Sequence, residues 1–231
     1  MESNRALPND SVVVISPQYC APGQVDLYIA KKVKKVTEGR HLGAFDINDN
    51  NIFKVKTSGF FSSRLILVDA EGVPIVSLKP VTFSPNDRWK VYRGDSTGSK
   101  DLLFSVKKSQ HPIKFKTELD VFLASNTSED VCDFMISQTY SENNCVIYRG
   151  DSDTIIAEMH RNKTVVREKV SEKDRRYSVT VHPNIDYAFV IAMSVVLNEI
   201  NTSRSNGDDG YVGGGGAGCG GGGCGGGCGG G

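Results

Sequence analysis

The chain has 231 residues, and its 27 lysine and arginine residues balance 27 aspartate and glutamate residues, so the formal net charge at pH 7 is zero. This length allows one large domain or two small ones with a sizeable core, and the zero net charge excludes a general electrostatic attraction to nucleic acid. The polar N-terminus lacks the charged and apolar regions of a secretory signal peptide. We therefore expect an intracellular protein whose residues 1–11 are disordered.

The body of the chain has the pattern of a series of short β-strands. Residues 12–15 predict a short strand, residues 19–23 a turn, and residues 25–30 a half-buried strand, because apolar and polar side chains alternate there. Four later segments each join two apolar runs through a turn rich in Gly, Asn and Asp, which is the pattern of a β-hairpin. These hairpins span residues 44–56, 65–78, 88–107 and 145–159. Further strands are predicted at residues 113–116, 121–124, 164–170 and 177–181, which makes about a dozen strands in all.

Two nearly identical hexapeptides, residues 91–96 and 147–152, each precede an apolar strand. They indicate an internal duplication of a hairpin pair. Both contain Arg-Gly-Asp, which can also be read as an adhesion motif. Because the chain has no secretory signal, we predict turns instead, with Gly94 and Gly150 at positive φ.

One apolar segment near the C-terminal end organises the rest of the chain. Between Tyr187 and Leu197 only Ser194 is polar, so a helix here has no wet face. The run of about 11 residues is too short to span a bilayer, which needs ~20. Its Val and Ile residues argue for a strand, whereas its Ala, Met and Leu residues, its length and the preceding Asp186 favour a helix. We predict a helix over residues 186–200 that is buried on every side.

The strands and the buried helix together predict the fold. Something must surround a helix that is apolar all round, and the residues before it form almost only strands. A mainly β domain over residues 12–200, with about a dozen antiparallel strands closed or nearly closed around a C-terminal helix, satisfies both observations and hides the sheet edges.

The composition changes abruptly after residue 200. Residues 201–211 are polar, and the chain is Gly-rich from residue 213 onward, so residues 201–231 are expected to be a disordered tail. Three cysteines interrupt the glycines, and they could carry thioester-linked acyl chains or bind metal: Cys219, Cys224 and Cys228. Three thiolates lack the fourth ligand of a structural zinc site. The alternative is a low-complexity tail with dispensable thiols.

No catalytic motif stands out. The four histidines are dispersed, and the chain contains no nucleophile elbow, phosphate-binding loop or dinucleotide fingerprint. Residues 46–51 look like the start of a calcium loop but lack the Gly at position six and the Glu at position twelve. We predict a tight turn there, no cofactor, no metal and no enzymatic activity.

The basic residues are the candidate binding groups. They occur in clusters on or beside predicted strands: Lys31, Lys32, Lys34 and Lys35; Lys107 and Lys108; Lys114 and Lys116; Arg161 and Lys163. If a barrel brings several of them together, they form a site for anionic lipid headgroups or phosphates. The alternative is that they are solvated side chains paired with the equally numerous carboxylates.

Four of these segments carry a family resemblance. Residues 14–22, 67–75, 88–96 and 186–190 together resemble the plant LURP-one-related family, and the similarity covers about residues 12–200. Its most specific part is the Trp-x-Val-Tyr-Arg-Gly-Asp block that begins at Trp89. One departure is Asn50-Asn51, where the first hairpin turn of the family often carries Gly. The turn should survive, because Asn tolerates the left-handed region.

The resemblance implies a fold and a set of functions. The family is similar to the tubby C-terminal domain and the phospholipid scramblases, which implies a twelve-stranded barrel threaded by a hydrophobic C-terminal helix. Tubby domains bind phosphoinositides, scramblases act at membranes, and the founder of the family is linked to basal defence. We therefore expect a monomeric, non-enzymatic binding module that is tethered to membranes by acidic phospholipids. It would be cytoplasmic, at the plasma membrane or nuclear, and act in plant defence or stress. The alternatives are a protein-interaction scaffold without lipid affinity, its partner unknown, and an enzyme acting on a small ligand in an open barrel end.

Overall fold

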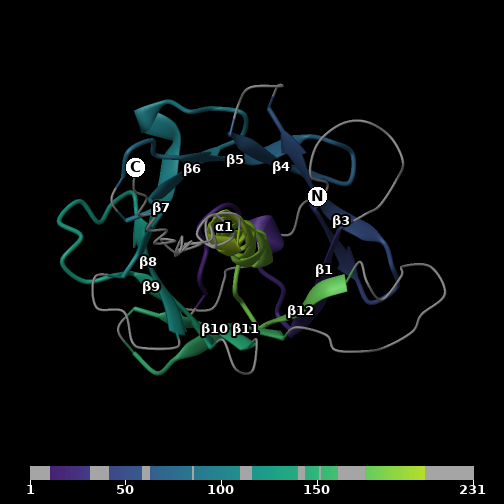
Figure 1. Ribbon diagram of the computed structural model, residues 1–231. Helices are drawn as coiled ribbons and strands as arrows, with labels where there is room; N and C mark the ends of the chain where they lie inside the picture. Colours follow the sequence, from purple (N-terminus) through teal and green to yellow (C-terminus); the bar gives the residue numbers. More distant parts are fainter. Residues whose placement is uncertain are drawn as a thin grey trace, which may run out of the picture.

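The computed structural model describes residues 11–31, 42–58, 63–84, 86–109, 116–139, 144–150, 152–160 and 175–205. Within these residues twelve antiparallel strands close into a barrel around one α-helix, α1 (Figure 1). The strands are β1 Val25–Lys31, β2 Leu42–Asp46, β3 Asn51–Thr57, β4 Leu65–Asp69, β5 Pro74–Pro80, β6 Trp89–Arg93, β7 Leu102–Lys108, β8 Lys116–Leu123, β9 Phe134–Thr139, β10 Asn144–Arg149, β11 Ile155–His160 and β12 Arg175–Val181. The predicted mainly β barrel with a C-terminal helix is confirmed.

The strand order follows the chain. Each strand pairs with its neighbours in sequence, and β1 pairs with β12 from Val25 opposite Val181 onward, which closes the sheet. A closed sheet leaves no edge strand open to pairing with other chains. Alternate residues of each strand face inward, as in β9, where buried and partly exposed side chains alternate from Phe134 to Thr139.

Helix α1, Tyr187–Ser205, fills the barrel. Its residues from Ala188 to Val196 are at most 5% exposed, so every face of this part contacts the barrel wall. The rings of Phe104 and Phe134 meet Phe189 edge-on, with centroids 5.0 and 4.9 Å away. The one polar side chain within this run, Ser194, donates its hydroxyl proton to the carbonyl of Val190 at 2.8 Å, which satisfies it without water.

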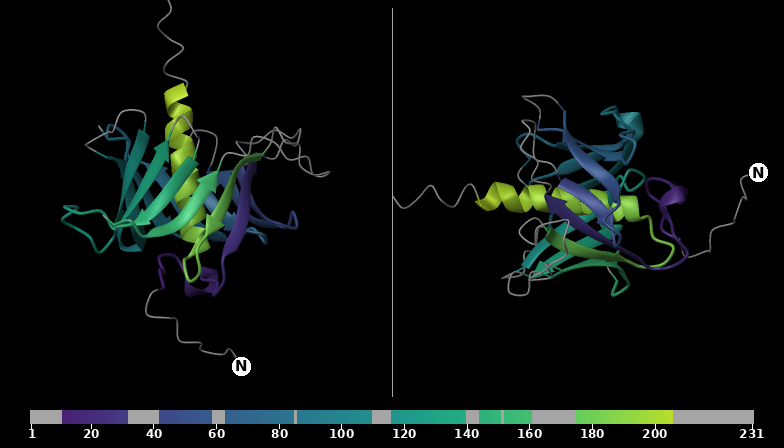
Figure 2. Two further views of the ribbon diagram at one scale, coloured as in Figure 1. Left: turned by 90° about the horizontal axis from the view of Figure 1, so that it is seen from below. Right: turned by 90° about the vertical axis from the view of Figure 1, so that its right-hand side faces the viewer.

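The helix is longer than predicted. It starts after Asp186 as expected, but it continues past residue 200 to Ser205. Asn201, Thr202 and Ser203 are no longer buried, because this last part leaves the barrel, as the side view in Figure 2 shows. The polar composition that indicated a disordered tail thus belongs, up to Ser205, to the end of the helix.

The hairpins are confirmed, and so are their glycines. Gly94 has a φ of 58° and Gly150 a φ of 59°, so both occupy the left-handed region that the turns require. In the β2–β3 turn the residue at positive φ is Asp49, at 66°. The Asp46 carboxylate accepts the backbone N–H groups of Asn48 and Asn50 at 2.9 and 2.8 Å. This is a tight Asx-type turn, as predicted, rather than a metal loop.

The predicted strand over residues 12–15 is wrong. Within it only Val12 makes a β-type contact, an isolated bridge to Ile185. Pro17–Tyr19 form a short 3-10 helix, η1, where we expected the turn to begin only at Tyr19. The physical reason is that the N–H groups of residues 14–16 donate to one carboxylate, that of Asp186, instead of to a neighbouring strand.

The region around β8 and β9 also differs from expectation. Strand β9 was not predicted, because its inward-facing Gln138 interrupts the apolar alternation; its amide oxygen accepts a hydrogen bond from Asn201 of α1 at 2.9 Å. The predicted strand at residues 121–124 belongs to β8, which begins at Lys116. Residues 113–115, the predicted strand 164–170 and the segments predicted to be disordered, 1–10 and 206–231, lie outside the described residues.

Candidate functional site

The two ends of the barrel are built differently. At the closed end, where α1 begins, residues 12–20 lie against the helix start. At the exit end α1 leaves the barrel (Figure 2). The antiparallel order places at the exit end the last residues of β1, β3, β5, β7, β9 and β11 and the first residues of the strands that follow them.

The closed end is held by the carboxylate of Asp186, which is fully buried. One of its oxygens accepts the N–H groups of Val14, Ile15 and Ser16 at 3.3, 2.7 and 3.0 Å. The other accepts the N–H of Phe189 at 3.0 Å and so caps the helix. Burial raises the pKa of Asp186, while these four hydrogen bonds oppose the rise. Asp186 therefore joins the N-terminal segment to the helix.

The side chains around Asp186 are structural as well. The rings of Tyr19, Phe53 and Tyr187 contact one another, with centroids 5.4 to 5.8 Å apart. Burial raises the pKa of the Cys20 thiol to about 11, so at neutral pH this cysteine is a thiol and a poor nucleophile. The arrangement stabilises the fold.

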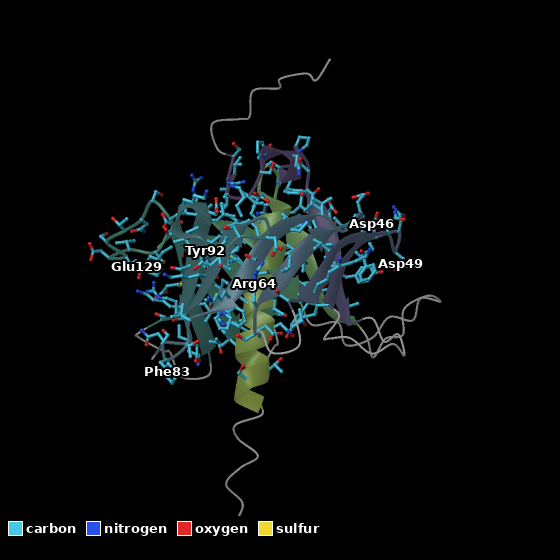
Figure 3. The ribbon with its side chains drawn as sticks, turned by 90° about the horizontal axis from the view of Figure 1, so that it is seen from above. Asp46, Asp49, Arg64, Phe83, Tyr92 and Glu129 are labelled. Atoms are coloured by element: carbon cyan, nitrogen blue, oxygen red, sulfur yellow. The ribbon has the colours of Figure 1, made fainter. Side chains whose placement is uncertain are left out.

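The exit end collects the predicted basic residues. Lys31 ends β1, Lys107 and Lys108 end β7, and Lys116 starts β8, so the described members lie on one rim. Figure 3 shows Phe83 on the same side of the molecule and Asp46 nearer the closed end. The other members fall outside the described residues: Lys32, Lys34, Lys35, Lys114, Arg161 and Lys163. The tail cysteines Cys219, Cys224 and Cys228 do too.

Two of the predicted lysines already have carboxylate partners. The Nζ of Lys107 lies 3.0 Å from Glu129 and 4.4 Å from the centroid of the Phe122 ring. Lys108 forms an ion pair with Asp87. For these two lysines the structure matches the alternative of cations paired with carboxylates. Lys116, by contrast, is exposed and has no ion pair within the described residues.

Glu129 is the centre of an ion-pair cluster on the outer wall. Arg88 binds it with both guanidinium arms, at 2.7 and 2.5 Å, and Lys107 adds a third contact. The hydrogen bond from Arg88 is the main reason that the pKa of Glu129 is lowered to about 2. Arg88 immediately precedes β6, Lys107 lies in β7 and Glu129 lies in the β8–β9 connection. No pattern in the sequence indicated that these three residues are close in space.

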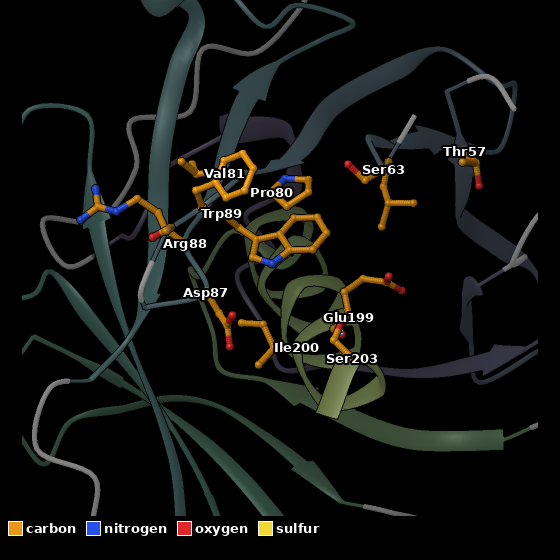
Figure 4. Close-up of a pocket in the computed structure, with 13 residues that line it drawn as sticks. Thr57, Ser63, Pro80, Val81, Asp87, Arg88, Trp89, Glu199, Ile200 and Ser203 are labelled. Atoms are coloured by element: carbon orange, nitrogen blue, oxygen red, sulfur yellow. Dashed lines mark hydrogen bonds between the residues drawn. The ribbon is translucent and has the colours of Figure 1, made fainter. Parts of the chain in front are cut away.

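A pocket of about 510 Å³ opens at the exit end between α1 and the barrel wall (Figure 4). Trp89 and Ile200, 7% and 2% exposed, form its inner part, and Glu199 is 9% exposed. Phe83 stands at its rim, 99% exposed and with a φ of 61°. The remaining lining residues are Thr57, Ser63, Leu65, Pro80, Val81, Ser84, Asp87, Arg88 and Ser203. This pocket was not predicted from the sequence, because Trp89 and Glu199 are far apart in the chain.

Among the residues that the structure describes, no group of three His, Cys, Asp or Glu side chains could hold a metal ion. No helix in the described ranges is long and apolar enough to cross a membrane.

The comparisons with known proteins agree on one family. The model of the LURP-one-related family matches residues 25–198. Protein LURP-one-related 15 of Arabidopsis thaliana is 42% identical over 200 residues, covering 86% of this chain and 90% of that protein. LURP-one-related 10 of the same plant is 40% identical over 195 residues, covering 84% and 99%. An X-ray structure of an Arabidopsis thaliana protein is similar with a TM-score of 0.64 and 38% identity, covering 82% of this chain and 98% of that one. The chain belongs to the LURP-one-related family.

Proposed function

We propose that this chain is a non-enzymatic, intracellular binding module that attaches to membranes through acidic phospholipids at its exit end. The observation that carries the proposal is that Lys31, at the end of β1, and Lys116, at the start of β8, lie on one rim. In the sequence Lys32, Lys34 and Lys35 follow β1, and Lys114 precedes β8. The setting in plant defence or stress is what the family resemblance implies.

A protein of zero net charge can bind an anionic membrane only if its cations are grouped. Each Lys near an anionic surface contributes about 1 kcal/mol, and the attraction fades within a Debye length of ~8 Å at physiological salt. A chain of zero net charge therefore binds such a surface only if several cations share one face. Lys107 and Lys108 contribute less, because Glu129 and Asp87 neutralise them. The densest remaining group is the one from Lys31 to Lys35.

An exposed aromatic side chain supports the same face. Phe83 projects from the β5–β6 connection at the exit end and is 99% exposed. An aromatic ring on a basic face is well suited to enter the boundary between headgroups and acyl chains.

The second candidate function is a protein-interaction scaffold without lipid affinity. The ion pairs of Lys107 and Lys108 favour it, because lysines that are paired with carboxylates attract anionic lipids less.

Vesicle co-sedimentation across a salt series tests the proposal. The full chain is mixed with phosphatidylcholine vesicles that contain or lack a phosphoinositide. Replacing Lys31, Lys32, Lys34 and Lys35 by Gln should weaken binding to the phosphoinositide vesicles by at least about tenfold. A matched control compares two pairs that remove the same charge: Lys31 and Lys32 replaced by Gln, and Lys54 and Lys100, exposed on the wall and in the β6–β7 connection away from the exit end, replaced by Gln.

The outcomes separate the candidates. Binding that falls with salt, and that the first pair weakens but the second does not, supports the lipid site. Equal losses in both pairs mean a response to total charge rather than a site. If the unaltered protein shows no salt-sensitive binding at all, the lipid proposal fails and the scaffold function takes its place.

A further inference from the structure

The exit-end pocket has an apolar lining with several hydroxyl groups. In Figure 4 Trp89 and Pro80 lie on the barrel wall across from Ile200 of α1. Ser63 and Ser203 are among the lining residues that add a hydroxyl group. The apolar lining residues are Leu65, Pro80, Val81, Phe83, Trp89 and Ile200. Such a lining suits an occupant with an apolar body and one polar end, as a tyrosine side chain has.

The three charged residues of the lining already have partners. Asp87 forms an ion pair with Lys108, and Arg88 binds Glu129 through both guanidinium arms. The carboxylate of Glu199 accepts a hydrogen bond from the neighbouring asparagine side chain at 3.3 Å. A charged ligand would have to compete with these partners, whereas an uncharged occupant leaves them in place. The pocket therefore favours an uncharged side chain.

Two exposed apolar side chains extend the pocket outward. Phe83 is 99% exposed and Val81 36%, and both belong to the pocket lining. Exposed apolar groups beside a pocket mark an interaction surface. An occupant that packs against Phe83 removes apolar surface from water, which is favourable.

The chain itself supplies a suitable segment close to this pocket. Helix α1 ends at Ser205, and Ser203, in its last turn, lines the pocket. Residues 206–231 contain one aromatic side chain, Tyr211, which Val212 follows; all the others are Asn, Asp, Gly, Ala or Cys. Tyr211 is the sixth residue after Ser205, and six residues of Gly-containing chain span about 13 Å on average and about 20 Å at most. Tyr211 can therefore reach the pocket.

The short connection makes even a weak contact sufficient. A short linker gives a tethered group an effective concentration in the millimolar range, so a contact with a Kd of about 1 mM is occupied about half of the time. Charge favours the same approach. Asp208 and Asp209 precede Tyr211 in a segment, residues 206–212, that contains no Lys or Arg, whereas Lys31 and Lys116 lie on the exit rim. Opposite charges attract the segment toward the rim.

We propose that the ring of Tyr211 occupies the exit-end pocket of its own chain, with Val212 against Phe83. The pocket is then an internal docking site, and a ligand that binds over Phe83 has to displace the tail. This inference goes beyond the proposed function and does not rest on it, because the occupant belongs to the chain and no lipid takes part.

The single tryptophan of the chain reports on the pocket, because Trp89 is one of its lining residues. The full chain is labelled with 5-fluorotryptophan, and its ¹⁹F resonance is recorded in the absence of lipid. Tyr211→Ser should shift the resonance, whereas Tyr211→Phe, which keeps the ring, should leave it near its original position. An acetylated peptide of residues 206–212 should move the resonance of Tyr211→Ser back at millimolar concentration. The same peptide should bind the unaltered chain about threefold more weakly, because the tethered ring competes with it.

A pair of substitutions on the barrel locates the contact. In a Phe83→Ala background the shift caused by Tyr211→Ser should shrink at least about twofold. Val73→Ala, in the β4–β5 turn and 58% exposed, is the matched control and should leave that shift unchanged.

Four results would overturn the proposal. Tyr211→Ser could leave the resonance unmoved, or Tyr211→Phe could shift it as far as Tyr211→Ser does. The peptide could bind the unaltered chain and Tyr211→Ser equally well. A shift that depends on protein concentration would assign the pocket to the tail of a second copy instead. Because no vesicles are present, each of these results is independent of the lipid-binding assay.

Discussion

The closed end and the exit end of the barrel each contain a buried carboxylate, and they use it differently. At the closed end four backbone N–H groups saturate Asp186, and aromatic rings fill the surrounding space. At the exit end Glu199 lines a pocket together with Trp89, and the exposed Phe83 lies at its edge. The exit end thus has a pocket and an exposed aromatic side chain, whereas the buried carboxylate of the closed end is surrounded by backbone donors. The difference indicates that one end maintains the fold while the other is available for binding.

The strongest way to test this difference is to introduce the same charge into both parts of α1. Ala192→Asp places a carboxylate at a position that is 0% exposed, and it should cost several kcal/mol and abolish folding. Ser203→Asp, on the exposed part beyond the barrel, should change the free energy of unfolding by less than about 0.5 kcal/mol. Urea denaturation followed by circular dichroism measures both. A cooperatively unfolding Ala192→Asp protein would contradict a helix enclosed on all sides.

A smaller loss is expected at the closed end itself. Asp186→Asn keeps the size of the side chain but replaces one accepting oxygen by an NH₂ group that cannot accept the N–H groups of residues 14–16. Hydrogen bonds to charged groups contribute about 1.5–3 kcal/mol, so we expect a loss of about 2–4 kcal/mol in urea unfolding. Asp26→Asn, at an exposed carboxylate of β1, serves as the control and should cost far less. Equal effects of both substitutions would mean that Asp186 does not hold the N-terminal segment.

The smallest effect is expected for the ion-pair cluster on the outer wall, and it should depend on pH. Chiefly through Arg88, the pKa of Glu129 is lowered from 4.5 to about 2. Because the folded pKa lies below the unfolded one, the ionised carboxylate stabilises the protein above pH 4.5, and this contribution is lost as pH falls from 4.5 toward 2. Glu129→Gln should therefore cost about 1–2 kcal/mol at neutral pH, a value reduced for solvent screening.

The pH dependence distinguishes this contribution from simple packing. The difference in urea midpoint between the unaltered protein and Glu129→Gln should shrink as pH falls below 4.5. A difference that stays constant over that interval would show that the charge of Glu129 contributes nothing.

Local patterns were enough to predict most of the barrel. Turn chemistry identified the hairpins and the positive φ of Gly94 and Gly150, and the absence of a polar face identified the buried helix. Strand β9 was missed because Gln138 faces inward and is satisfied by a residue of the helix. The pocket was missed because Trp89 and Glu199 meet only after the barrel closes. Sequence periodicity reports on neighbours in the chain, whereas these contacts depend on distant segments.

The lysine prediction shows the same limit of sequence reasoning. The sequence shows clusters of cations, but only the strand order shows that the described ones lie on the same rim of the barrel. The carboxylates that pair with Lys107 and Lys108 come from loops elsewhere in the sequence. The family resemblance was confirmed and the twelve-stranded barrel with it. Lipid binding remains a prediction.

The pairing of β1 with β12 determines when this protein can fold. Val25 lies opposite Val181, and the helix that fills the barrel follows only after that strand, at residues 187–205. During synthesis the inward apolar side chains of the earlier strands have no core to join until the last part of the domain has left the ribosome. Contacts between such distant segments make folding slow. Until the helix is available, the strands synthesised earlier expose apolar surface and unpaired edges. The chain should therefore need chaperones during synthesis, and truncation before α1 should yield aggregates rather than a partly folded domain.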